Sequence, residues 1–320
     1  MTRHAWAQAG RHLRAPRAVT PIIGAVLLVA TSVASVAADG PAKYSAWGAP
    51  TPVSAANTAA HDGCPIESPN GKQLYIASTR AGGFGKNDIW VANRPTKTAP
   101  WGPMTNLGSA INSANQEFCP TPIGGGRLLF VSDRAACGAT PGMTPPVGDM
   151  YLTRQRKNGT WIQPRHLGCV ADGSGPNFTG GEFGPSLVTT SSGTYLYFSS
   201  TGTTGNHDIY RSLRAPGGTF GTPHAVAELN TAAVDQMPNV SRDGTEIVFA
   251  SSRGGNMDIW TATFDQATGL WSSPVPVAAV NTAEPESRPS MSGDGKRLYF
   301  GRGATADIYV STRVELDDGD

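Results

Sequence analysis

The chain of 320 residues contains 39 Gly and 25 Pro, and only 15% of its residues are charged, a composition that argues against a helical bundle. Hydrophobic residues make up 39% of the chain, enough for a sizeable core, which argues against an intrinsically disordered protein. Without the four arginines of the first 38 residues, the remainder has 21 basic and 24 acidic residues. This slightly acidic body offers no surface for nucleic-acid phosphates, so no nucleic-acid partner is expected.

The N-terminus predicts an export signal over residues 1–38. A basic stretch ends at Arg17, and an apolar run extends from Ile22 to Val36. This run is 15 residues long, short for a membrane span of roughly 20, so we expect cleavage near Ala38. The alternative is an uncleaved anchor. No later apolar run is long enough to cross a bilayer, and the mature protein is expected to be secreted or otherwise extracytoplasmic.

Beyond this segment the chain repeats one unit five times. Each copy begins with Asn, followed five residues later by an acid and three residues after that by Pro. The copies are Asn57, Asp62, Pro65; Asn112, Glu117, Pro120; Asn177, Glu182, Pro185; Asn230, Asp235, Pro238; and Asn281, Glu286, Pro289. Each continues through a glycine turn into an apolar-aromatic run, and then into a second run that opens with Asp. This order predicts strands joined by hairpins.

A last strand in each copy is predicted to begin at an aromatic residue, and its position indicates how the repeats close. These residues are Trp101, Trp161, Phe220 and Trp271, while the fifth example, Trp47, lies before the first copy. Residues 47–53 are therefore expected to supply the outer strand of the last blade. The prediction is an all-β, five-bladed propeller of four-stranded antiparallel blades over residues 47–313. A short linker (39–46) and an acidic tail (314–320) flank it.

The repeat resembles a known family of propeller repeats, most clearly in the fourth copy. That copy contains Ser241-Arg242-Asp243-Gly244, Ile247-Val248-Phe249, Ser251-Ser252-Arg253 and Asp258-Ile259-Trp260. These residues resemble the WD-like repeat of the periplasmic protein TolB and of many exported bacterial proteins. The third copy departs from the pattern, with Thr201 where the Arg is expected. The resemblance implies the fold; propellers of this kind serve as docking platforms, as envelope modules and as hydrolases or lyases, so it does not decide the function.

The repeating acids are the first candidate ligand-binding residues. They are Asp62, Glu117, Glu182, Asp235 and Glu286, and we expect them near one mouth of the central channel. A ring of carboxylates could bind Ca²⁺ or take part in glycoside cleavage. The sequence suggests no other cofactor. The alternative is structural, with each acid held in its own turn or paired with Arg80, Arg134, Arg253 or Arg302. Recurrence in every blade favours the structural interpretation.

Two further candidates break the repeat near the same mouth. His61 has no counterpart in the other copies and could be a ligand or a general base; the alternative is a solvated loop histidine. Arg288 stands where the other copies have Cys, Gly or Met, and could meet an anionic ligand or pair with a neighbouring acid. No His cluster has the spacing of zinc ligands, so no zinc site is expected.

The four cysteines all follow the export signal and predict two disulfides. Cys64 and Cys119 occupy the same repeat position in adjacent blades, while Cys137 and Cys169 lie in two long insertions. We therefore predict the pairs Cys64–Cys119 and Cys137–Cys169. The alternative, a catalytic thiol, needs a free Cys beside a His base. The insertions, in blades two and three, are the best positional indication of a binding site, although plain surface loops would look the same.

No catalytic motif stands out, since neither a Gly-x-Ser-x-Gly elbow nor a phosphate-binding glycine loop occurs. The sequence therefore favours an exported, non-catalytic platform that binds a protein or glycan of the cell envelope. The alternative is a carbohydrate-active hydrolase or lyase that uses two channel-mouth carboxylates with His61. A third hypothesis is a structural envelope protein whose channel holds a cation.

Overall fold

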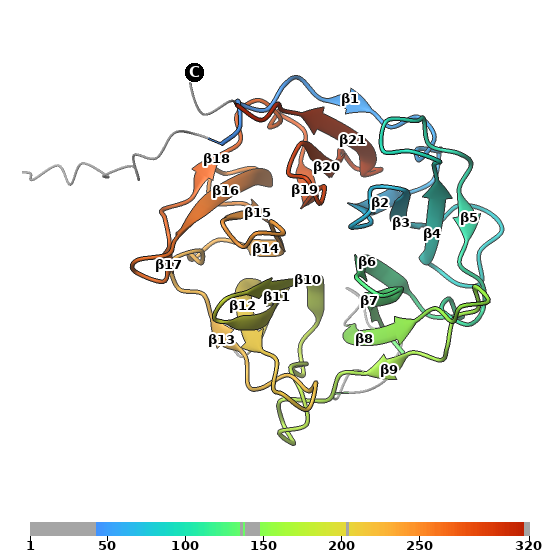
Figure 1. The fold of residues 1–320 in the computed structure, drawn as a ribbon, viewed down its shortest axis with the longest axis horizontal. Coiled ribbons are helices and arrows are strands. Elements are labelled where there is room, and N and C mark those ends of the chain that lie inside the picture. The colour runs from blue at the N-terminus through green and yellow to red at the C-terminus, as the bar shows by residue number, and fades with distance from the viewer. Residues whose placement is uncertain (1–42, 135–136, 138–147, 203–204, 317–320) are drawn as a thin grey trace, which may run out of the picture. The chain divides into compact units, whose positions relative to one another are not determined.

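The computed structural model describes residues 43–134, 137, 148–202 and 205–316. Five antiparallel sheets surround one axis as the blades of a propeller, which confirms the predicted fold (Figure 1). The predicted export signal lies outside the described residues, as does the end of the predicted acidic tail. Within the described part of the chain, no helix is long and apolar enough to cross a membrane.

Each blade contains four strands in order from the axis outward, with one additional short strand in blade 4. Blade 1 consists of β2 (Asp62–Glu67), β3 (Gln73–Ser78), β4 (Asp88–Asn93) and β5 (Thr105–Asn106). Blade 2 consists of β6 (Glu117–Ile123), β7 (Arg127–Ser132), β8 (Asp149–Arg154) and β9 (Arg165–His166). Blade 3 consists of β10 (Glu182–Thr190), β11 (Gly193–Ser200), β12 (Asp208–Leu213) and β13 (His224–Ala225). Blade 4 consists of β14 (Asp235–Val240), β15 (Glu246–Ser251), β16 (Asp258–Asp265), β17 (Leu270–Trp271) and β18 (Val275–Pro276). Blade 5 consists of β19 (Glu286–Met291), β20 (Arg297–Arg302), β21 (Asp307–Thr312) and β1 (Thr51–Pro52).

The predicted closure of the ring is confirmed. The strand β1, from before the first copy, pairs with β21 of the last blade. Asn57 adds a second link, because its side chain donates to the Ile308 carbonyl (3.1 Å) and accepts from the Ile308 amide (2.7 Å). The outer strands are shorter than predicted: β1, β5, β9, β13 and β18 have two residues each, and each begins four residues after the repeating aromatic.

Every inner strand carries a β-bulge at the repeating Pro. Pro has no N–H to donate to the ladder, and the register between the first two strands shifts there in all five blades. The residue before each Pro has left-handed backbone, with φ between 47° and 60°. These residues are Cys64, Cys119, Gly184, Met237 and Arg288. The bulges thus bring one position from each blade to the axis, and we call these five residues the bulge ring.

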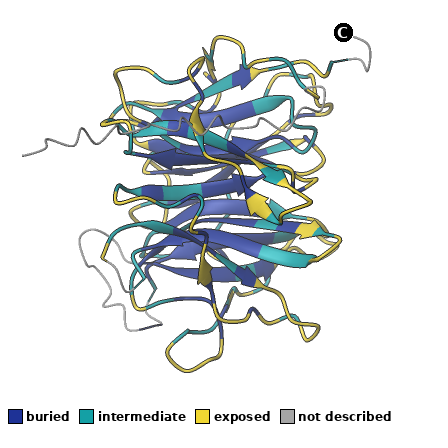
Figure 2. Ribbon diagram, turned by 90° about the vertical axis from the view of Figure 1, so that its left-hand side faces the viewer, coloured by how far each residue is buried: buried dark blue, intermediate teal, exposed yellow. Residues whose placement is uncertain are grey.

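The hydrophobic core lies between neighbouring blades. Leu128 and Phe130 of blade 2, for example, are fully buried and pack with Ile66 and Tyr75 of blade 1. The strands therefore have few exposed residues, while the loops that join them are mostly exposed (Figure 2). Because packing between the blades buries the side chains of the strands, candidate binding residues must be sought in the loops and along the axis.

Candidate functional site

The loops divide between two faces. We call the face where the inner strands begin, at the repeating acids, the acid face, and the opposite face, with the turns that follow the inner strands, the hairpin face. Because neighbouring strands are antiparallel, the loops after the second strands also lie on the acid face. The described residues of both long insertions, in blades 2 and 3, are therefore on the acid face; residues 135–136 and 138–147 of the first insertion lie outside the described part of the chain.

In four blades the repeating acid is held by its own blade. In blade 1, Asp62 accepts from the Ser78 hydroxyl (2.5 Å) and from the Arg80 guanidinium (2.6 Å). The same pairing joins Glu117 to Arg134, Asp235 to Arg253 and Glu286 to Arg302. We call each pair an acid–arginine latch. All four acids are fully buried, so the geometry supports the structural interpretation of these predicted site residues.

The latch also ties down the segment that precedes each inner strand. Arg134 donates to the Ile111 carbonyl (2.6 Å), one residue before the repeating Asn, and its counterparts do the same. In blade 5 the pairing register places Arg302 where the other blades have Ser, and its guanidinium still reaches Glu286 and the Val280 carbonyl. The contacts are thus kept although the arginine has moved along the strand.

Blade 3 has no latch. The strand register places Gly202 at the arginine position, so the predicted departure lies one residue after Thr201. In addition, Phe178 replaces the Ser or Thr that follows the repeating Asn in the other copies. The Phe178 ring packs on Tyr210 with a centroid distance of 4.9 Å. The Phe178 ring thus covers the aromatic side chain of its blade, as the arginine does in the other blades, but it carries no charge.

Glu182 of blade 3 therefore differs from the other four acids. It accepts only from the Phe178 amide (3.0 Å) and the Ser200 hydroxyl (2.9 Å), and it is fully buried. Burial, and then the charge of Asp149 on blade 2, raise the pKa of Glu182 well above its ordinary value. A protonated Glu182 can donate a hydrogen bond to Asp149. Both causes favour the neutral form of Glu182 next to Asp149.

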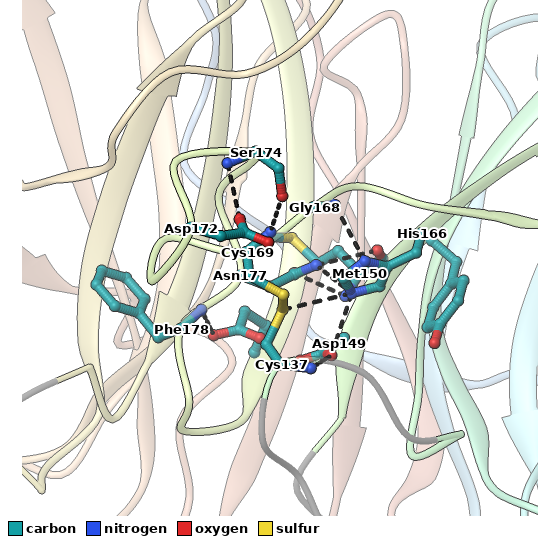
Figure 3. The surroundings of a disulfide bond; sticks show 12 residues. Cys137, Asp149, Met150, His166, Gly168, Cys169, Asp172, Ser174, Asn177 and Phe178 are labelled. Atoms are coloured by element: carbon teal, nitrogen blue, oxygen red, sulfur yellow. Dashed lines mark hydrogen bonds and ion pairs between the residues drawn. A yellow bond between two sulfur atoms is a disulfide. The ribbon is translucent and has the colours of Figure 1, made fainter.

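Asp149 connects this acid to the two insertions (Figure 3). Its Oδ2 accepts from the Cys137 amide (2.8 Å) and lies 3.1 Å from His166 Nε2. His166 Nδ1 accepts from the Gly168 amide (3.1 Å), and its Nε2 lies 2.9 Å from Asn177 Nδ2 as well as next to Asp149. In the sequence Asp149 is only one of the Asp residues that open the second run of each copy; the missing arginine of the third copy was the signal for these contacts.

The predicted disulfide between Cys137 and Cys169 is confirmed (Figure 3). It joins the loop before β8 to the loop before β10, so blades 2 and 3 are linked on the acid face. His166 lies close enough to both sulfurs for a three-residue metal site. Because the two sulfurs are bonded to each other, neither is available as a thiolate ligand.

The predicted disulfide between Cys64 and Cys119 is wrong: both cysteines are free thiols, with their sulfurs 3.2 Å apart. Each belongs to a separate bulge, so the sulfurs are in contact across neighbouring inner strands without a covalent bond. The hydrogen bond between the sulfurs raises the pKa of Cys64. Burial raises the pKa of Cys119, but the Cys64 hydrogen bond and the charge of Arg288 outweigh it and lower this pKa to about 7.

Arg288 lies inside the bulge ring rather than at the channel mouth. It is 1% exposed, and its Nη2 donates to the Thr121 hydroxyl of blade 2 at 3.2 Å. Its Nε and Nη1 have no hydrogen-bond partner among the described residues. Pairing with a neighbouring acid, one of its two predicted roles, is thus not seen among the salt bridges of the described residues.

The acid face also presents exposed side chains from blade 1. His61 is exposed next to buried Asp62, and the structure does not bring its ring to the Glu182 cluster. Phe84, which the sequence analysis missed, is 52% exposed although its loop is held firmly. Its amide and that of Gly85 both donate to Asp88 (2.6 and 3.2 Å). An aromatic residue inside the glycine-rich stretch Gly82-Gly83-Phe84-Gly85 was the signal that could have found it.

The described cavities lie mainly toward the hairpin face. One cavity of about 340 Å³ is formed by the far ends of all five inner strands, including Ile66, Thr121 and Met291. A larger cavity of about 700 Å³ lies beside blades 4 and 5, between Lys43, Asp243 and Arg313. The repeating acids and these cavities are therefore at opposite ends of the inner strands.

Comparison with known proteins shows the fold without naming a family. No family model and no curated protein match the sequence. An α-L-arabinofuranosidase from Lactobacillus brevis is 12% identical, with a TM-score of 0.56, and covers 81% of this chain and 92% of its own. The catalytic domain of a GH62 α-L-arabinofuranosidase from Coprinopsis cinerea is 14% identical (TM-score 0.55; 85% and 98% covered). A TolB candidate from Agrobacterium tumefaciens is 17% identical (TM-score 0.47; 87% and 88% covered). At these identities the likeness shows a propeller fold alone.

Proposed function

We propose that this protein is an exported binding platform that recognises a protein or glycan of the cell envelope on its acid face. The proposal rests on one observation: blades 1–3 hold residues that do not repeat on loops that are fixed in place. Phe84 is exposed on a loop fixed by Asp88, and the Cys137–Cys169 disulfide links the neighbouring insertions. Exposed aromatic side chains on rigid loops are typical binding anchors.

The repeating acids support binding rather than catalysis. Four of them are fully buried and engaged by an arginine, and they are remote from the described cavities. A glycosidase needs two carboxyl groups that flank an accessible bond. The latches remove these four carboxylates from that role.

The proposal can be tested with immobilised mature protein, residues 39–320, exposed to envelope extracts and to a panel of cell-wall glycans. Phe84→Ala should weaken capture of the retained species by about 30-fold, corresponding to a hot-spot loss of ~2 kcal/mol. Leu213→Ala is the matched control, because Leu213 is 50% exposed at the hairpin end of β12. Equal capture by wild type and F84A, or equal losses in both variants, would count against a site on the acid face.

Export by the predicted signal belongs to the same proposal. The confirmed disulfide supports an oxidising, extracytoplasmic location, since such bonds rarely persist in the cytoplasm. The resemblance to the TolB-type repeat points in the same direction. The mass of the mature chain recovered from an expressing cell would test it, with cleavage near Ala38 as the expected result.

A glycoside hydrolase is the second candidate, favoured by one specific observation. Burial and the charge of Asp149 raise the pKa of Glu182, and glycoside cleavage uses a carboxyl group with a raised pKa beside a second carboxyl group. Two structures of the same fold are arabinofuranosidases. Glu182→Gln should abolish hydrolysis of any responsive glycan if this candidate is correct, whereas unchanged hydrolysis would remove Glu182 from the mechanism.

A further inference from the structure

The bulge ring contains a pair of free sulfurs that face each other. Cys64 and Cys119 come from neighbouring blades, and their sulfurs are 3.2 Å apart. Cys119 is fully buried, while Cys64 is only partly covered. The Gly184 amide of blade 3 also hydrogen-bonds Cys119. The pair is therefore enclosed, but it can be reached from the side of Cys64 by something small.

The same ring contains a buried positive charge that lacks a carboxylate. Arg288 has two guanidinium nitrogens with no hydrogen-bond partner among the described residues, in contrast to the four latch arginines. Gly184 leaves the room for it, because a Cβ there would lie 2.5 Å from Arg288 Nη1. A buried cation without a counter-charge is strongly unfavourable, so an anionic group is expected next to it.

The two sulfurs can supply that negative charge as thiolates, and together they would carry one negative charge more than the guanidinium balances. The charge of Arg288 acts on both Cys64 and Cys119. Two thiolates carry two negative charges against the single positive charge of the guanidinium. One bound monovalent cation would balance the ring.

We propose that Cys64 and Cys119 form a two-thiolate site for a soft monovalent metal ion of the Cu(I) class, with Arg288 as the counter-charge of the resulting anionic complex. Both sulfurs bind as thiolates, the thiol protons leave to solvent, and the ion keeps its oxidation state. Two metal–thiolate bonds of about 2.3 Å in a linear arrangement span about 4.6 Å, whereas the sulfurs are 3.2 Å apart. The two sulfurs must therefore move apart by up to about 1.4 Å. This inference is independent of the acid-face platform.

The donor set selects this class of ion. Thiolates are soft ligands that favour Cu(I), whereas a structural zinc site normally has four ligands. Among the described residues, the groups of three or more potential ligands do not include this pair, and the nearby guanidinium opposes a divalent ion. A bulky thiol reagent would not fit around the buried Cys119 sulfur.

The test uses mature protein purified under anaerobic conditions without reductant, so that the Cys137–Cys169 disulfide remains intact. Thiol counting after denaturation should give two free thiols. Titration with Cu(I) against a chromogenic Cu(I) chelator should then give one tightly bound ion per chain. X-ray absorption at the copper edge should show sulfur neighbours only.

Four variants decide between this site and others. Cys64→Ser and Cys119→Ser should each abolish tight uptake, and Arg288→Met should weaken it by about 10–100-fold, the usual loss when a group next to the ligands is removed. The Cys137→Ser/Cys169→Ser variant, once shown to be folded, should retain uptake. The proposal is overturned if wild-type protein with two free thiols binds no Cu(I), if it has fewer than two free thiols, or if both C64S and C119S still bind the ion.

Discussion

The contrast between Glu182 and Glu117 leads to a prediction about stability and pH. Glu182→Gln should preserve every hydrogen bond, because the amide oxygen can accept from Phe178 and Ser200 while the NH₂ group donates to Asp149 in place of the acid proton. The variant removes only the ability to ionise.

The sign follows from the direction of the pKa shift. In the unfolded chain Glu182 titrates near 4.5, and in the folded protein its pKa is raised well above that value. Between these two pKa values the folded state holds a proton that the unfolded state has lost, so wild-type stability falls as the pH rises. The loss is ~1.4 kcal/mol per pH unit as long as the pH stays below the raised pKa. Below about pH 4 the two proteins should differ little.

Urea unfolding followed by tryptophan fluorescence at pH 5, 6 and 7 would measure this. The difference in unfolding free energy between E182Q and wild type should grow in favour of E182Q across the series. Glu117→Gln is the matched control: it leaves the Arg134 guanidinium, 24% exposed, without its carboxylate. It should therefore lose ~3 kcal/mol, the low end of the range for breaking a buried pair. A pH-independent difference for E182Q, or one that grows in favour of wild type, would refute a protonated Glu182.

Three further predictions concern the ring as a whole. Asn57→Ala should lower the unfolding free energy by about 2 kcal/mol, because the Ile308 amide loses its partner and the Ile308 carbonyl keeps only the Val53 amide, whereas Asn158→Ala in an exposed turn should change it by less than about 0.5 kcal/mol; equal losses in urea unfolding would contradict the closure argument. The Cys137→Ser/Cys169→Ser variant should lose roughly 3–4 kcal/mol, since the disulfide joins residues 32 apart; an unchanged denaturation midpoint would show that the insertions are fixed by other contacts. Arg288→Met should stabilise the metal-free protein by about 1–4 kcal/mol, and a loss of stability would show that the guanidinium is already compensated.

The sequence was sufficient for the features that recur. Five identical spacings from Asn to acid to Pro predicted five blades, and the displaced Trp47 predicted that a segment before the first copy closes the last. The structural interpretation of the acids followed from the same recurrence, and four of the acids lie in latches. Repetition works as an internal alignment, so it separates residues that maintain a blade from those that do not.

Contacts between different repeats could not be predicted in this way. Cys64 and Cys119 were predicted to be bonded because they hold the same position in two repeats. The repeat position sets the height of each residue along the axis, but it does not set the distance between the two sulfurs. Glu67 is a second example. It is buried at the end of β2 and binds Arg94 of its own blade, and Arg297 of blade 5, 230 residues away. Ring closure brings this arginine to Glu67, and neither the motif nor its spacing contains that information.

The departures from the repeat are distributed unevenly, and this bears on function. Latches and bulges maintain the blades in which they occur, so the loss of one should reduce stability. Blade 3 nevertheless lacks its latch, and the Phe178 ring together with the neighbouring disulfide replaces the missing ion pair. Apolar packing of this kind can hold a blade as well as a buried salt bridge does, because it carries no desolvation cost. The substitution is thus tolerable for folding, yet it leaves Glu182, an acid with a raised pKa, without an arginine on the acid face. This change lies on the same face as exposed Phe84, and it is better explained by a requirement of that face than by a requirement of the fold.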